Sequence, residues 1–245
     1  MHVTDEEFAA RLAHDTGQLL LAVNNTSLLS SHDLGDAGDS LAQDFIARTL
    51  ELHRPNDAVL SEEARDDAAR LTAKRVWIVD PLDGTSEYRR RGEDWAVHIA
   101  LVQNGVPTAS AVALPPRGTV FRSDTVGKAD GPLTRSMVVS RGRPPMEALL
   151  VAKRLGMQLD PVNSAGVKAM AVVEGRADAY VHAGGQHQWD SAAPVGVALA
   201  AGLWCSRLSG APLVYNTRST YLPDLVICRQ EVKDDILSVL HALRR

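Results

Sequence analysis

The sequence contains little cysteine and no long hydrophobic run. Its 245 residues include only two cysteines, Cys205 and Cys228, too few for a disulfide framework. We expect both to be free thiols that pack as small apolar side chains in a reducing cytoplasm. No stretch reaches the roughly 18 apolar residues that a membrane span needs. The N-terminal stretch MHVTDEEFAARL is acidic, which does not fit a signal peptide.

The sequence also lacks an excess of positive charge. It has 26 lysines and arginines against 30 aspartates and glutamates, for a formal net charge of −4. Proteins that bind nucleic-acid polymers carry a basic footprint, so this class is excluded. What is present is an ordinary globular composition, with 45% hydrophobic and 23% charged residues. A chain of this length can bury its own core without disulfides or metals.

Apolar periodicity predicts helices and strands along the whole chain. Thr4 and Glu7 form a capping box that starts the first helix. Asp39 or Ser40 is expected to cap the second helix after a turn-rich stretch, and that helix ends before Pro55. Further helices are predicted at 145–155, 165–174, 191–201 and 231–243. Strands are predicted at 58–60, 75–80, 95–103, 107–114, 119–122, 137–140, 178–182 and 225–228.

Strands and helices alternate in both halves, which predicts an α/β (α+β) fold in two lobes. The strands at 95–103 and 107–114 form an antiparallel hairpin around Asn104-Gly105. The segment TVGKADGP at 125–132 is polar and rich in glycine, as expected for a boundary. We therefore expect an N-terminal α+β lobe at 1–131 and a C-terminal α/β lobe at 132–245.

Two carboxylates follow an apolar strand in the run DPLDGTS at 80–86. Asp80 and Asp83 would repel each other at the end of a buried strand, and a divalent cation is the usual remedy. Oxygen ligands favour a hard ion such as Mg²⁺, and the Leu82 carbonyl could complete the set. The backbone N–H groups and hydroxyls at 84–86 form a candidate anion site. Adjacent cation and anion sites predict a phosphate ester; the alternative is an Asx turn.

Two other acidic positions have more than one interpretation. Glu62 and Glu63 follow the apolar run AVL, either at a strand end or as a solvated patch. Asp190 precedes an apolar helix and fits a helix N-cap, a metal ligand or both. The eight histidines show no zinc-ligand spacing, and we expect ordinary structural roles for them.

Together these residues resemble the inositol monophosphatase superfamily of Mg²⁺-dependent, lithium-sensitive phosphatases. The matching motifs are Glu62-Glu63, then DPLDGTSEY at 80–88, then WDSAA at 189–193. The resemblance spans nearly the whole chain and implies a sandwich of alternating helix and sheet layers. Pro194 stands where the family often has glycine or alanine, in the first turn of the expected helix, where proline is tolerated.

Within the superfamily the chain is similar to the CysQ-type branch of 3′-phosphoadenosine 5′-phosphate (PAP) phosphatases. The segments that carry this similarity are EDWAVHIAL at 93–101, SAGVKAMAVVEGRADAYVHAGG at 164–185 and YLPDLVIC at 221–228. It implies an enzyme that hydrolyses PAP, and by extension its sulfated form PAPS, in connection with sulfate assimilation. The alternatives are an inositol or fructose-1,6-bisphosphate phosphatase with the same metal site, and a non-catalytic binding protein.

The resemblance assigns the metal ligands position by position. Glu62, Asp80 and the Leu82 carbonyl would hold the first of two Mg²⁺ ions, and a third ion is left open. Asp80, Asp83 and Asp190 would hold the second. The first ion would activate a water, and the second would stabilise the leaving oxygen.

The catalytic pair implied by the resemblance is Asp39 and Thr85, which would orient the water and take its proton. PAP carries two phosphates, so a cationic contact for the uncleaved phosphate is expected at Arg141 or Lys168, although either could be a solvated charge. The full set of expected substrate contacts is Glu62, Leu82, Asp83, Gly84, Thr85, Ser86, Arg141, Lys168 and Asp190. We expect a small phosphate ester as the partner, no nucleic-acid polymer and no membrane. The resemblance makes a homodimer an option, and the oligomeric state is left open.

Overall fold

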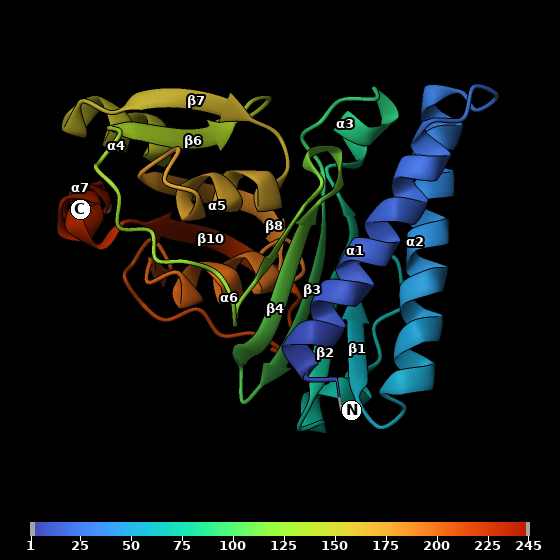
Figure 1. The fold of residues 1–245 in the computed structure, drawn as a ribbon. Helices are drawn as coiled ribbons and strands as arrows, with labels where there is room; N and C mark the ends of the chain where they lie inside the picture. The colour runs from blue at the N-terminus through green and yellow to red at the C-terminus, as the bar shows by residue number, and fades with distance from the viewer. Residues whose placement is uncertain (1–2, 244–245) are drawn as a thin grey trace.

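The computed structural model describes residues 3–243 and arranges them in alternating layers of helix and sheet (Figure 1). Helices α1 and α2 cover the outer face of one sheet, and helices α4 and α7 cover the outer face of a second sheet. Helices α5 and α6 lie between the two sheets. The arrangement confirms the predicted layered α/β (α+β) sandwich.

The first sheet has the strand order β1-β2-β3-β4-β5. Its strands are β1 (Ala58–Ser61), β2 (Val76–Asp83), β3 (Ala96–Gln103), β4 (Val106–Leu114) and β5 (Thr119–Arg122). Strands β1 and β2 are parallel, and the other neighbours are antiparallel. The predicted turn between β3 and β4 is confirmed, with positive φ at Asn104 and Gly105.

The second sheet has the strand order β7-β6-β8-β10-β9. Its strands are β6 (Ser136–Ser140), β7 (Gln158–Val162), β8 (Ala179–His187), β9 (Trp204–Ser206) and β10 (Tyr221–Cys228). The sequence did not predict β7 or β9. Strand β7 is an edge strand, mostly exposed, with Pro161 in its interior, so it lacks the buried alternation that marks a strand.

The long helices are α1 (Asp5–Asn24), α2 (Ser31–His53), α4 (Met146–Leu155), α5 (Ala165–Val173), α6 (Ala192–Ala200) and α7 (Lys233–Ala242). Short helical segments are α3 (Thr85–Arg89), η1 (Ala68–Thr72), η2 (Pro115–Arg117) and η3 (Gln230–Val232). The Thr4 hydroxyl accepts the Glu7 amide at 3.2 Å, which confirms the predicted start of α1.

The predicted start of α2 is wrong, because Ser30 and not Asp39 or Ser40 caps this helix. The glycines before Asp39 are sites of close approach instead of turn residues. A Cβ at Gly38 would lie 2.7 Å from Tyr88 Cε1, so α2 needs glycine where α3 packs against it. Asp39 therefore lies within a helix, on the side that meets α3.

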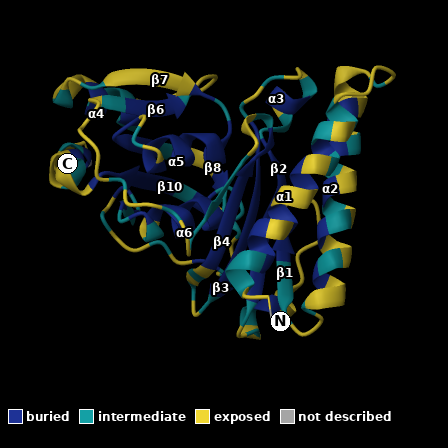
Figure 2. Ribbon diagram, viewed as in Figure 1, coloured by how far each residue is buried: buried dark blue, intermediate teal, exposed yellow. Residues whose placement is uncertain are grey.

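The buried side chains fill the spaces between the layers, and the exposed ones lie on the outer helices and on β7 (Figure 2). Every residue of β2 is buried. Trp77 and Val79 pack toward α1 and α2, whereas Val76 and Ile78 pack toward α5 and α6. By the same alternation, Asp80 faces the α5/α6 layer.

Both cysteines are free thiols, as predicted. They lie on neighbouring strands, with Cys205 on β9 and Cys228 on β10. Among the helices of residues 3–243, none has the length and apolar character to cross a membrane.

Candidate active site

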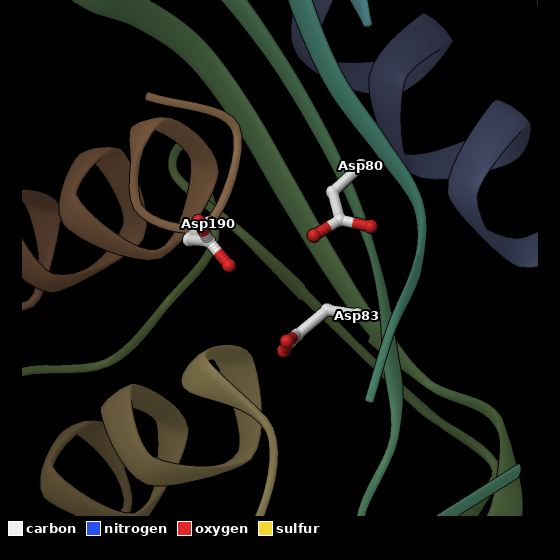
Figure 3. A group of neighbouring side chains, drawn as sticks. All are labelled: Asp80, Asp83 and Asp190. Atoms are coloured by element: carbon white, nitrogen blue, oxygen red, sulfur yellow. The ribbon is translucent and has the colours of Figure 1, made fainter. Parts of the chain in front are cut away.

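Three aspartates meet between the first sheet and the middle helices. The side chains of Asp80 and Asp83 come from β2, and Asp190 comes from the turn that leads into α6; each offers one oxygen, and these oxygens lie within 4.8 Å of one another. Figure 3 shows the three carboxylates pointing toward a common space. The structure thus brings together carboxylates that stand far apart in the sequence.

An irregularity in β2 places both of its aspartates on one side. In a regular strand, side chains three residues apart face opposite sides. The pairing of β2 with β3 shifts register between Asp80 and Asp83, with Pro81 in the irregular stretch. The extra residue turns Asp83 toward the same helices that Asp80 faces.

Asp83 is anchored as an anion at the start of α5. Its carboxylate accepts the Ser164 hydroxyl, the Ala165 amide at 3.1 Å and the Gly166 amide at 2.7 Å. Burial alone would raise the pKa of this carboxyl, but the attraction of His98 and the hydrogen bonds outweigh burial and hold its pKa well below the ordinary range. These contacts favour the ionised form of Asp83 beside the other two carboxyls.

Asp80 is a buried carboxylate with few hydrogen-bond donors to offset its burial. One carboxylate oxygen accepts the Leu82 amide at 3.1 Å, but the other has no hydrogen-bond partner within residues 3–243. Burial, followed by repulsion from Glu62 and Asp83, raises the pKa of Asp80 well above its ordinary value. An orphaned buried oxygen beside two more carboxylates is a donor set that fits a hard divalent cation.

The pKa values of Asp190 and Glu62 are also raised, by burial and by repulsion from nearby carboxylates. Burial, and next the charge of Asp83, raise the pKa of Asp190 to about 6, although its carboxylate accepts the His187 amide. Burial, and next the charge of Asp190, raise the pKa of Glu62 to about 7. Glu62 as a residue is exposed to solvent, which weakens this rise in its pKa, and it lies outside the group of three. Its role as a metal ligand remains a prediction.

These raised pKa values predict that the metal-free protein loses stability as the pH rises. A carboxyl whose folded pKa lies above its unfolded value holds its proton more tightly when folded, so ionisation between the two values destabilises the fold. For Asp190 and Glu62 the interval runs from 3.8 and 4.5 to about 6 and 7. We expect the melting temperature in EDTA to fall over this interval, and saturating Mg²⁺ to abolish the fall.

Thermal melts at closely spaced pH values, with EDTA and with Mg²⁺, check this expectation. Asp190→Asn is the matched control, because it removes one of the titrating carboxyls and should make the EDTA curve shallower. Because the pKa of Asp83 is lowered, its ionisation makes the fold more stable as the pH rises, but only at pH values below its ordinary pKa of 3.8. A melting temperature that rises in EDTA across the interval would contradict the expectation.

The two residues of the predicted catalytic pair, Thr85 and Asp39, lie close to each other. The Thr85 hydroxyl is 3.1 Å from the Leu82 carbonyl and 3.4 Å from an Asp39 carboxylate oxygen. Burial, and next repulsion from Glu63, raise the pKa of Asp39 to about 7. Asp39 is thus a group whose protonation changes near neutral pH, as a proton acceptor requires.

The turn at Gly84, directly after Asp83, begins α3. Gly84 has φ +94°, and a Cβ there would lie 2.7 Å from the Asp94 carbonyl oxygen, so only glycine fits. The N–H groups that open a helix have no partner within it. The amides of Thr85 and Ser86 are in this position, with Ser86 exposed.

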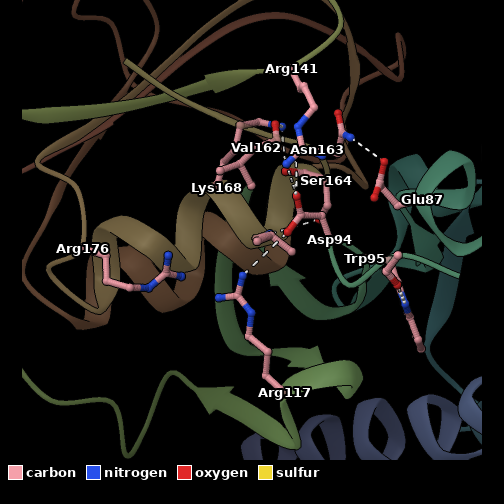
Figure 4. Close-up of polar contacts among 12 residues, drawn as sticks. Glu87, Asp94, Trp95, Arg117, Arg141, Val162, Asn163, Ser164, Lys168 and Arg176 are labelled. Atoms are coloured by element: carbon pink, nitrogen blue, oxygen red, sulfur yellow. Dashed lines mark hydrogen bonds and ion pairs between the residues drawn. The ribbon is translucent and has the colours of Figure 1, made fainter. Parts of the chain in front are cut away.

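The two predicted cationic contacts are engaged with other groups. The exposed Arg141 donates to Asp94 at 3.2 Å and to the Pro161 carbonyl, in the network that Figure 4 draws. Lys168 is buried and donates to the Ser164 carbonyl at 2.6 Å. Burial lowers the pKa of Lys168 to about 8. Both remain predictions as substrate contacts.

Two groups that touch the aspartates were missed by the sequence interpretation. His98 lies 3.3 Å from Asp83, and Ser164 donates to the same carboxylate. His98 is the one polar side chain in the apolar run WAVHIAL, a signal that could have singled it out. Ser164 gave no such signal, because serine before an apolar helix is explained by its cap on the Val167 amide.

Comparison with known proteins agrees with the motifs. Residues 2–244 match the family model for the inositol monophosphatase family. A Mycobacterium bovis protein named 3′-phosphoadenosine 5′-phosphate phosphatase is 51% identical over 238 residues, which cover 92% of this chain and 89% of that protein. The Escherichia coli K12 protein named 3′(2′),5′-bisphosphate nucleotidase CysQ is 30% identical over 232 residues, covering 86% and 94% of the two chains.

The fold comparison gives the same result. The crystal structure of CysQ from Bacteroides thetaiotaomicron, described as a bacterial member of the inositol monophosphatase family, matches with a TM-score of 0.81 and 25% identity. The match covers 94% of this chain and 99% of that one. An inositol monophosphatase from Anabaena matches with a TM-score of 0.77 and shows the same fold, over 97% and 94% of the two chains at 19% identity. With its motifs, its layered fold and its three converging aspartates, the chain belongs to the inositol monophosphatase family.

Proposed function

We propose that this chain is a divalent-metal-dependent phosphatase that hydrolyses the 3′-phosphate of PAP to give AMP and phosphate. The observation that carries the metal dependence is the group of Asp80, Asp83 and Asp190, with one buried oxygen of Asp80 lacking a hydrogen-bond partner in the described part of the chain. The choice of PAP is supported by relatives at about half identity that carry the name PAP phosphatase.

Mg²⁺ is the proposed ion, at two positions. Asp80, Asp83 and Asp190 would hold one, and Glu62, Asp80 and the Leu82 carbonyl would hold the other. Bound there, Mg²⁺ would supply activation of a water and stabilisation of the leaving oxygen. The all-oxygen donor set favours a hard ion over zinc.

The residues of the chain supply orientation and proton transfer. The Thr85 hydroxyl, which contacts the Leu82 carbonyl and Asp39, would hydrogen-bond the attacking water. Asp39, with its pKa raised to about 7, receives the proton through this hydroxyl. The amides of Gly84, Thr85 and Ser86 hold the phosphoryl oxygens at the start of α3.

The uncleaved 5′-phosphate needs a cation, and Arg141 is the proposed contact. Its guanidinium is about half exposed, with 54% of the side-chain surface open, and pairs with Asp94 at 3.2 Å. A phosphate could take the place of this carboxylate, because both are anions that accept hydrogen bonds from a guanidinium. Lys168 is the proposed second cation, although a direct contact requires it to give up the Ser164 carbonyl.

We propose that the enzyme consists of two lobes, at 1–131 and 132–245. Each sheet forms within one of these ranges, and the site combines Asp80 and Asp83 of the first with Asp190 of the second. A homodimer, a cytoplasmic location and a role in sulfate assimilation remain predictions from the resemblance.

Phosphate release from PAP, fructose 1,6-bisphosphate and inositol 1-phosphate, each with Mg²⁺ and with EDTA, tests the proposal. We expect PAP to be hydrolysed fastest by at least about tenfold, which is about 1.4 kcal/mol of differential transition-state binding. All turnover should disappear in EDTA. Faster hydrolysis of inositol 1-phosphate or fructose 1,6-bisphosphate than of PAP would overturn the substrate assignment but not the proposed metal site.

A further inference from the structure

His98 is a buried polar side chain that the proposed chemistry does not use. It lies on β3, directly opposite Asp80 in the register of β2 with β3. Its exposed fraction is 0%. Because opposed residues of paired strands share a face, the imidazole points into the space between the first sheet and helices α5 and α6.

The ring of His98 lies close to Asp80 and Asp83 on β2 and to the residue that precedes Asp190. Nε2 lies 3.3 Å from an Asp83 carboxylate oxygen, and Nδ1 lies 3.9 Å from an oxygen of Asp80. The same Nδ1 lies 3.2 Å from the carbonyl of Trp189, the residue before Asp190. One side chain therefore spans from β2 to the turn that carries the third aspartate.

The surrounding chain is shaped to accept this ring. A Cβ on Gly166 would lie 2.2 Å from His98 Nε2, so the absence of a side chain at Gly166 makes room for the imidazole. The Gly166 amide donates at 2.7 Å to the same Asp83 oxygen that faces the ring. The start of α5, Asp83 and His98 are thus packed as a unit.

A filling role alone does not account for these contacts. An apolar side chain would fill the same space without the cost of burying two ring nitrogens. Instead, Nδ1 is hydrogen-bonded to the Trp189 carbonyl on the turn before α6, and Nε2 lies 3.3 Å from an Asp83 oxygen on the first sheet without making a hydrogen bond within residues 3–243. Through these contacts one side chain links the first sheet to the turn before α6.

We propose that His98 is a positioning residue that sets the separation of Asp83 and Asp190 and thereby the affinity of the site for a divalent cation. This inference rests on the proposed function, because it assumes that these aspartates bind metal. Groups that orient metal ligands typically change metal affinity by about 10- to 100-fold when they are lost. His98 acts through the ligands and contacts no reacting atom.

Two substitutions separate the two contacts of the ring. In His98→Asn the amide nitrogen stands near the position of Nδ1, so the contact with the Trp189 carbonyl is kept and the contact with Asp83 is lost. In His98→Gln the amide nitrogen stands near Nε2, so the contact with Asp83 is kept and the one with Trp189 is lost. If His98 joins the two sides, each substitution alone should weaken metal binding.

Metal binding is measured without substrate, by titration calorimetry with Mg²⁺ and by the electron paramagnetic resonance signal of free Mn²⁺. We expect the Kd of both variants to rise by about 10-fold or more. His14→Asn is the control, because His14 is an exposed residue of α1 with 54% of its side chain open to solvent; its Kd should equal that of the wild type. Circular dichroism in EDTA checks that each variant folds.

Kinetics against metal concentration distinguish positioning from a structural role. A positioning defect raises the Mg²⁺ concentration needed for half-maximal turnover, and excess Mg²⁺ then restores kcat. A general loss of structure lowers kcat at every Mg²⁺ concentration. If His98→Asn fails to fold, His98→Gln, which fills more of the space of the ring, decides the question.

An unchanged or tighter Kd in folded His98→Gln would overturn the inference. If the wild type itself binds no divalent ion, the proposed function fails and not only the role of His98. If the wild type binds metal but does not prefer PAP, the substrate assignment fails and the test of His98 remains valid. The three failures are therefore distinguishable.

Discussion

Asp80→Asn is expected to abolish metal-dependent turnover while raising the stability of the metal-free protein. A divalent ion contributes several kcal/mol of transition-state charge stabilisation, so loss of a shared ligand should lower kcat by about 1,000-fold or more. In the metal-free fold, the Asp80 carboxyl is buried, repelled by its neighbours and half unsatisfied. Asparagine removes the charge and can still accept the Leu82 amide.

Asp83→Asn is the matched comparison, because its environment is the reverse. Asp83 accepts donors from Ser164, Ala165 and Gly166, and an amide would present its own N–H groups to some of them. We expect the same loss of turnover as in Asp80→Asn but a lower melting temperature in EDTA. Phosphate release and thermal melts on both variants check the pair. A fall in the EDTA melting temperature of Asp80→Asn would contradict the view that Asp80 is kept for metal.

The sequence predicted the chemistry of β2 better than its geometry. DPLDGTS follows the apolar run VWIV, and this order alone predicts two carboxylates at the end of a buried strand. It did not show that both carboxylates face one side, since strand alternation puts Asp80 and Asp83 on opposite faces. That outcome depends on the irregular pairing with β3, which is a property of two strands and not of one segment.

Long-range contacts explain the other differences. The glycines before Asp39 were interpreted as turn residues, but Gly38 serves a close approach to Tyr88, which is visible only when α3 is packed. His98 was expected to have an ordinary role, because its partners Asp83 and Trp189 come from distant segments. The position of Asp190 in the site could be inferred only from the family motif.

Thr85→Val is expected to lower kcat by about 100-fold or more at saturating Mg²⁺, because general acid–base contributions are typically of this size. Valine has nearly the shape of threonine, so the start of α3 should be preserved. What is lost is the hydroxyl between the Leu82 carbonyl and Asp39. Thr85→Ser keeps the hydroxyl and should keep most of the activity.

The dependence of kcat on pH distinguishes a role of Asp39 in proton transfer from a role in packing only. Asp39 must be ionised to take a proton, and its pKa is raised to about 7, so kcat of the wild type should rise with pH through this region. Asp39→Asn should remove that rise and lower kcat to the level of Thr85→Val. Because the two residues act through one hydrogen bond, the double variant should be little worse than either single one. Additive losses would show that Thr85 and Asp39 act independently and would exclude a shared proton path.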